Sequence, residues 1–160
     1  MWLLDNGSVY RRSPSTLWLE LTSKCPLRCV FCSRQAVRGD GEHLDFALLA
    51  PLFDGLESLE ILRLNYAGES ANYPHLLEAI ELARSRFPAT LELVTSLVTM
   101  PLEVVRRLPD SGIDRISISL HSTDPARFVE IYGGGTLEAF ERRVEILRQA
   151  AEASGDGGSA

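Results

Sequence analysis

Residues 17–32 read LWLELTSKCPLRCVFC, an alternating apolar and polar run that leads directly into three cysteines. The alternation predicts a strand over residues 17–22. The cysteines follow with the spacing Cys-x3-Cys-x2-Cys and an aromatic residue directly before the last one. Three thiolates on one short loop can hold three irons of a cubane cluster and leave the fourth iron open to another ligand. We therefore expect Cys25, Cys29 and Cys32 to bind a 4Fe–4S cluster.

Zinc is the alternative metal for the same three cysteines. Clustered cysteines in a chain without secretory features are more often metal ligands than disulfides. Zinc usually takes four ligands, so a histidine such as His43 would have to join them. The segment between Cys32 and His43 is long enough to allow this. The spacing favours the iron–sulfur site, and a zinc-stabilised, non-catalytic binding module remains the second interpretation.

The composition sets broad limits on the protein. A chain of 160 residues with 45% hydrophobic residues can bury the core of one domain. Its net charge of −6 gives no general attraction to nucleic acid or to an anionic membrane, and neither partner is expected. No apolar stretch approaches the length of a membrane span. Because every cysteine lies inside one metal-like motif, we expect a protein of the reducing cytoplasm.

Strand-like and helix-like segments alternate along the rest of the chain. We expect strands at residues 17–22, 59–66, 90–96 and 114–121 and helices at residues 45–53, 73–86, 101–111, 124–132 and 137–151. Repeated strand–helix units imply a parallel sheet with right-handed crossovers. The fold class is therefore α/β. We expect an N-terminal extension over residues 1–16, a core over 17–152 and a polar, disordered tail over 153–160.

The two faces of each predicted strand differ in character. In the second strand, for example, Leu62 and Leu64 oppose Arg63 and Asn65. A parallel sheet covered on both sides is nearly all aliphatic, and a tightly packed eight-stranded barrel fills its interior with branched apolar side chains. The polar faces instead predict a wider or more open barrel around a ligand. The alternative is an antiparallel sheet with one solvated face, and the long helical crossovers argue against it.

The cysteine loop resembles the signature of the radical S-adenosylmethionine (SAM) enzymes, and the segment after the second strand extends that resemblance. In this family the corresponding strand ends in a Gly-Gly-Glu-Pro-like motif that holds the amino group of SAM. Here residues 67–70 read Ala-Gly-Glu-Ser, so the central Gly-Glu matches and the flanking residues depart. The resemblance implies that Gly68 and Glu69 contact SAM. Glycine lets the backbone approach a ligand closely, and a carboxylate can accept hydrogen bonds from an ammonium group.

The ends of the third and fourth strands continue the resemblance. Residues 94–99, VTSLVT, are similar to the family's Thr-Asn-Gly segment, and this implies that Ser96 bonds the carboxylate or ribose of SAM. Residues 116–122, ISISLHS, are similar to the Ser-Leu-Asp-Gly ending and place Ser119 in an equivalent role. His121 occupies a position at which aspartate is common in the family. We expect it to be either a substrate contact or an ordinary loop residue. Phe31 matches the aromatic residue of the cysteine loop and would lie near the adenine.

The resemblance implies that the chain is part of an enzyme. It also implies that the fold is a partial (βα) barrel. The family cleaves SAM reductively to a 5′-deoxyadenosyl radical, with an electron from a donor such as flavodoxin or ferredoxin, and the radical attacks a peptide or small-molecule substrate. No catalytic residue beyond the cluster ligands is assigned. The family core has six βα units and this chain supplies four, so we expect the first part of a longer protein. An inactive truncated remnant is a further alternative.

Overall fold

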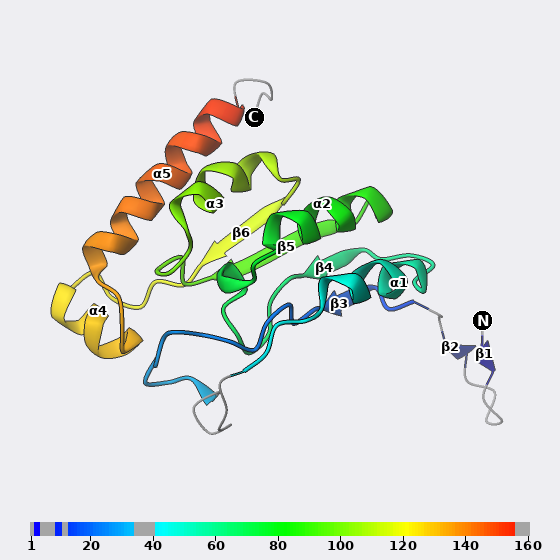
Figure 1. The fold of residues 1–160 in the computed structure, drawn as a ribbon, viewed down its shortest axis with the longest axis horizontal. Coiled ribbons are helices and arrows are strands. Elements are labelled where there is room, and N and C mark those ends of the chain that lie inside the picture. Colours follow the sequence, from blue (N-terminus) through cyan, green and yellow to red (C-terminus); the bar gives the residue numbers. More distant parts are fainter. Residues whose placement is uncertain (1, 4–8, 11–12, 34–40, 156–160) are drawn as a thin grey trace.

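Four parallel strands form the centre of the protein. A computed structural model describes residues 2–3, 9–10, 13–33 and 41–155. The strands are β3 (Thr16–Trp18), β4 (Ile61–Arg63), β5 (Thr90–Thr95) and β6 (Arg115–Ile118), and they pair in that order (Figure 1). Each neighbouring pair is parallel. The predicted α/β class and parallel sheet are confirmed, and the antiparallel alternative is wrong.

A small hairpin precedes this sheet. Strands β1 (Trp2–Leu3) and β2 (Val9–Tyr10) pair antiparallel with each other and form a separate sheet. The sequence analysis placed only an extension in this region.

The strands are shorter than predicted because their ends pair with other segments. Leu19 still donates its N–H to the Arg63 carbonyl oxygen, but beyond it residues 21–23 exchange hydrogen bonds with residues 42–44 instead. After Arg63 the carbonyl oxygen of Leu64 accepts a hydrogen bond from the Ser70 hydroxyl. A sequence pattern shows which residues alternate, but it cannot show where the partner segment changes.

Helices follow the strands as the alternation predicts. They are η2 (Phe46–Leu48), α1 (Leu49–Asp54), η3 (Ser70–Asn72), α2 (Leu76–Arg86), α3 (Leu102–Arg107), η4 (Leu108–Asp110), α4 (Pro125–Tyr132) and α5 (Leu137–Gly155). Asp124 caps α4 by accepting a hydrogen bond from the Arg127 N–H at 2.8 Å. Helix α5 continues three residues into the predicted tail, and residues 156–160 lie outside the described residues. No helix in the described part of the chain is long and apolar enough to cross a bilayer.

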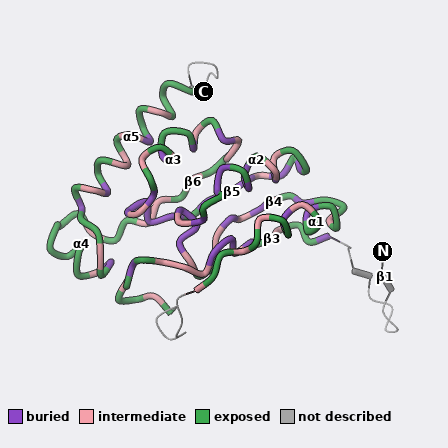
Figure 2. Tube along the Cα trace, in the orientation of Figure 1, coloured by how far each residue is buried: buried purple, intermediate pink, exposed green. Residues whose placement is uncertain are grey.

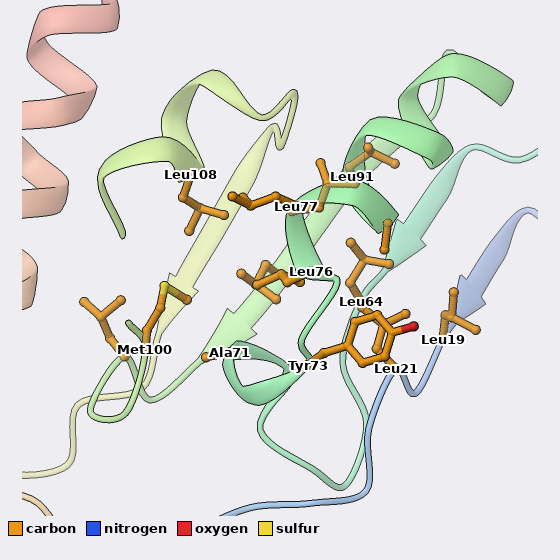
Figure 3. Close-up of a cluster of buried hydrophobic side chains, with 14 of the residues drawn as sticks. Leu19, Leu21, Leu64, Ala71, Tyr73, Leu76, Leu77, Leu91, Met100 and Leu108 are labelled. Atoms are coloured by element: carbon orange, nitrogen blue, oxygen red, sulfur yellow. The ribbon is translucent and has the colours of Figure 1, made fainter. Parts of the chain in front are cut away.

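The core lies between the helices and one face of the sheet. Leu62, Leu64, Leu91 and Leu93 belong to β4, β5 or the residue after β4 and are fully buried. Figure 2 colours the buried stretches of the chain, which lie mainly in the central part of the fold. Leu64 and Leu91 lie near Leu76 and Leu77 of α2 in the buried cluster of Figure 3. Burial of each such side chain contributes about 1.5–3 kcal/mol. The aliphatic faces of the strands therefore pack against helices.

The opposite face of the sheet is open. Trp18 is 51% exposed and Val94 is 38% exposed, and Ser117 on β6 is also exposed. Among the described strands, none pairs with the outer edge of β3 or of β6. Leu120 is 46% exposed because β6 ends at Ile118 and the chain has left the sheet by that point.

The loop after β4 passes very close to the start of the cysteine loop. The Glu69 N–H donates to the Lys24 carbonyl oxygen at 2.9 Å. A Cβ atom on Gly68 would lie only 1.9 Å from the carbonyl oxygen of Thr22. This position therefore requires glycine because of a backbone-to-backbone approach, which fixes the two loops against each other.

We predict that Gly68→Ala lowers the free energy of unfolding by about 1–3 kcal/mol, because the new methyl group forces the two backbones apart. Gly134→Ala is the matched control, since a Cβ there meets its nearest atom, Leu27 Cδ2, at an ordinary 3.7 Å. Urea denaturation followed by circular dichroism measures both. Equal midpoints for the two variants would contradict the close approach.

Candidate active site

A pocket of about 240 Å³ lies at the carboxyl ends of the strands, where parallel strands bring their following loops together. Its walls come from the cysteine loop, the loop after β4, the ends of β5 and β6, and the end of α4. The lining residues are Cys25, Leu27, Cys29, Phe31, Cys32, Asn65, Tyr66, Gly68, Glu69, Val94, Thr95, Ser96, Ser119, His121 and Tyr132. Every residue that the sequence predicts for the cluster or for SAM is in this set.

The end of α4 anchors the cysteine loop. The N–H groups of Arg28 and Val30 donate to the carbonyl oxygens of Tyr132 and Ile131, both at 2.9 Å. Gly133 ends α4 in the left-handed conformation, with φ of 61°, and a Cβ there would lie 2.7 Å from the Arg28 carbonyl oxygen. These contacts set the position of the cysteines relative to the sheet.

The three cysteines are half-buried and line the pocket together. Burial, with the neighbouring Cys25 and Cys32, raises the pKa of the Cys29 thiol above its ordinary value. A cationic metal centre reverses this effect, because a coordinating thiol is deprotonated. Three thiolate donors facing one pocket fit the ligand set of a 4Fe–4S cluster, in which each cysteine binds a different iron.

His43 does not join the cysteines. It is exposed and lines a separate hollow with Glu42 and Asp45. In the described ranges, no three His, Cys, Asp or Glu side chains converge on one ion position, as a single zinc ion would require. The ligand set that the zinc alternative needs is therefore not assembled in this structure.

Glu69 is the most constrained polar residue of the pocket. Its side chain is buried, with only 6% of the residue exposed. Oε1 accepts hydrogen bonds from Thr95 Oγ1 at 2.7 Å and from the Ala71 N–H at 3.2 Å. Oε2 accepts from the Ser96 N–H at 2.8 Å and from Ser96 Oγ at 2.6 Å. All four donors are neutral.

The charge of Glu69 has no cationic partner in the described part of the chain. The ion pairs found there involve other acidic residues. A buried carboxylate is stable when it is hydrogen-bonded, and a nearby cation stabilises it further. Because Glu69 lines the pocket, a ligand that carries an ammonium group would supply that cation.

A strained turn at Leu97 directs the N–H and the hydroxyl of Ser96 toward the Glu69 carboxylate. Leu97 is fully buried and adopts φ of 62°, in the left-handed region. This conformation is unfavourable by about 1–2 kcal/mol for a residue with a Cβ atom. The Leu97 N–H donates to Thr95 Oγ1 at 2.9 Å. Ser96 lines the pocket as predicted, but its N–H and hydroxyl both donate to Glu69.

Ser119 and three aromatic rings form the remaining wall. The Ser119 N–H donates to the Thr95 carbonyl oxygen at 2.9 Å, which continues the β5–β6 pairing beyond Ile118. The Ser119 carbonyl oxygen accepts from the Tyr132 hydroxyl at 2.5 Å. The rings of Phe31 and His121 meet edge to face, with 4.4 Å between centroids, and the His121 ring is 5.7 Å from that of Tyr132.

Several lining residues were not predicted from the sequence. Tyr132 was expected only as the last residue of a helix, although an aromatic residue directly before three glycines is a signal of a packed turn. Asn65 was expected only on a polar strand face. It lines the pocket, and its buried Oδ1 has no hydrogen-bond partner among the described residues.

The sequence of this chain matches a known protein family and several related proteins. The model of the radical SAM superfamily matches residues 19–155. A PqqA peptide cyclase of Ruegeria pomeroyi is 34% identical over 141 residues, which cover 86% of this chain and 36% of the cyclase. A probable GTP 3′,8-cyclase of Methanococcus maripaludis (strain C7) is 24% identical over 142 residues, which cover 85% of this chain and 46% of that protein. The chain thus spans less than half the length of these relatives.

Solved structures show the same fold. A structure of anSMEcpe with bound AdoMet superposes with a TM-score of 0.66 at 16% identity, over 86% of this chain and 41% of that one. Methylornithine synthase (PylB) gives a TM-score of 0.61 at 12% identity, over 84% of this chain and 41% of the synthase. Such likeness shows the arrangement of strands and helices, and the family match rests on the sequence. The chain belongs to the radical SAM superfamily, whose members use a 4Fe–4S cluster and S-adenosylmethionine.

Proposed function

We propose that this chain provides the cluster and SAM site of a radical SAM enzyme that acts on a peptide or a small molecule. One observation carries the proposal: a single pocket joins three cysteines to a buried carboxylate that has no cationic partner in the described part of the chain. Family membership supports the same activity. The activity of the whole enzyme is part of this proposal, because the chain spans 36% of the related cyclase.

The cysteine loop would hold the cluster through Cys25, Cys29 and Cys32. When bound, the cluster and SAM supply reductive cleavage of SAM to a 5′-deoxyadenosyl radical, with an electron from a donor such as flavodoxin or ferredoxin. A reducing cytoplasm is the compartment in which we expect these thiolates to persist. The core would extend over residues 17–152, as the sequence predicts.

The other pocket residues would bind and orient SAM. Glu69 would attract the amino group of SAM through its negative charge, because Thr95 and Ser96 hold its carboxylate in place at the pocket. Gly68 keeps the backbone close to the cysteine loop. The Ser119 hydroxyl has no partner among the described residues and would bond the ribose or carboxylate of SAM. Holding a reactant in one orientation is a large part of the catalytic effect of such a site.

The aromatic wall would complete the site. Phe31 is 59% exposed and presents its ring at the pocket, where it would lie against the adenine. His121 is exposed next to it and would contact the substrate. The peptide cyclases among the relatives support a peptide substrate, and the GTP 3′,8-cyclases support a small one.

We predict that replacing Cys25, Cys29 and Cys32 together with alanine abolishes cluster binding, because no other cysteine exists in the chain. Ser33→Ala, at an exposed position next to the motif, is the matched control. Iron and sulfide analysis after anaerobic reconstitution, with electron paramagnetic resonance of the reduced protein, measures the outcome. Equal iron in the triple variant and the control would refute the cluster site.

We predict that Glu69→Gln weakens SAM binding by about 1.5–3 kcal/mol, which is the usual contribution of a hydrogen bond to a charged group. The amide keeps the shape of the side chain but removes the negative charge. Calorimetric titration of SAM into the reconstituted protein measures the change. Glu130→Gln, at an exposed position of α4, is the control. Unchanged affinity in Glu69→Gln, with normal iron content, would remove Glu69 from the SAM site.

A further inference from the structure

Four side chains form a row across the open face of the sheet. Trp18 pairs in register with Arg63, Arg63 with Glu92, and Glu92 with Arg115, so the row crosses all four strands at one level. We call these residues the cross-strand row. They lie on the face opposite the helices, where Trp18 is 51% exposed.

Two ion pairs and a cation–π contact connect the side chains of the row. Arg63 Nε donates to Glu92 Oε2 at 2.6 Å, and Arg115 Nη1 donates to Glu92 Oε1 at 2.9 Å. The guanidinium carbon of Arg63 lies 4.8 Å from the centroid of the Trp18 ring, in a cation–π contact. The hydrogen bond from Arg63, followed by that from Arg115, lowers the pKa of the Glu92 carboxyl, so Glu92 is ionised at neutral pH.

The two arginines keep unused hydrogen-bond donors and an uncompensated charge. Two guanidinium groups face one carboxylate, which leaves the row with one net positive charge. Nη1 and Nη2 of Arg63, and Nε and Nη2 of Arg115, have no partner in the described ranges. The side chain of Arg115 is 69% exposed and that of Arg63 is 35% exposed. A ligand can therefore reach these donors.

The row is continuous with the pocket. Asn65 follows Arg63 by two residues and lines the pocket, and its buried Oδ1 has no partner among the described residues. Val94 follows Glu92 by two residues and also lines the pocket. Two residues of a strand span about 7 Å, so the row lies one such step away from Asn65 and Val94 along the same face. One bound molecule can extend from the pocket to the row.

We propose that the cross-strand row binds a carboxylate group of the substrate, and this inference rests on the proposed function of the pocket. The planar fork of an arginine matches a carboxylate with two parallel hydrogen bonds. A single negative charge cancels the net charge of the row. A phosphate dianion would leave the row with a net negative charge, and Glu92 would repel it more strongly than it repels a carboxylate.

The test uses Trp18 as the reporter. Trp2→Phe leaves Trp18 as the only tryptophan of the chain, and its ring lies under Arg63. The peptide acetyl-Gly-Glu-Gly-amide, propionate and inorganic phosphate are titrated at constant ionic strength while Trp18 fluorescence is recorded. Acetyl-Gly-Gln-Gly-amide is the uncharged control ligand. We expect saturable binding of the two carboxylates, and their relative affinity shows whether a peptide or a small molecule is the better source.

Substitutions at Arg115 assign the binding to the row. Arg115→Gln should weaken carboxylate binding about tenfold or more, and Arg115→Lys should weaken it less because the charge remains. Arg106→Gln on α3, also exposed, should leave it unchanged. The inference is overturned by absent carboxylate binding, by equal binding of the Glu and Gln peptides, by tighter binding of phosphate, or by equal affinity in Arg115→Gln.

Titration of SAM into the same proteins after cluster reconstitution separates this inference from the proposed function. We expect Arg115→Gln to bind SAM as the wild type does, because the row lies outside the pocket lining. Absent SAM binding by the wild type would refute the proposed function, whatever the carboxylate titration shows. Normal SAM binding without carboxylate binding would refute the row alone.

Discussion

The site depends on one buried carboxylate. Glu69 receives hydrogen bonds from Thr95 and Ser96 at the end of β5, and its own N–H donates to Lys24 at the start of the cysteine loop. It therefore connects the cysteine loop and the loop after β4 to β5, the third strand of the four-stranded sheet. Gly68 permits this connection, because any side chain there would collide with the Thr22 backbone. The cysteines and the residues that we propose to bind SAM consequently form one unit rather than two independent loops.

The same carboxylate explains why strain persists nearby. Leu97 holds a left-handed backbone that is unfavourable for leucine, and the turn directs two Ser96 donors to Glu69. Such strain is retained where surrounding contacts fix the conformation, and it is concentrated at functional sites. Full burial of the Leu97 side chain offsets part of the unfavourable energy. Neutral donors satisfy the hydrogen bonds of Glu69 but leave its charge for a cationic ligand.

The sequence predicts the parts of this protein that depend on local patterns. Cysteine spacing predicts a metal-binding loop, and the alternation around Leu62 and Leu91 predicts the buried face that the structure shows, because both signals lie within a few neighbouring residues. Features that depend on distant pairing were missed. Residues 21–23 leave the sheet to pair with residues 42–44, and the cross-strand row exists only because four strands share one register. The partnership of Ser96 with Glu69 likewise depends on a turn that no motif encodes.

We propose that the cysteine loop and Glu69 enclose one site in which the amino group of SAM meets the cluster. Electron–nuclear double resonance on the reduced, reconstituted protein, with SAM labelled with ¹⁵N at the amino group, tests this contact most directly. We expect a ¹⁵N hyperfine coupling large enough to require a bond between iron and that nitrogen, which the amino group can form once its ammonium has lost a proton. SAM that is bound according to calorimetry but shows only weak coupling from distant nitrogen would contradict this proposal.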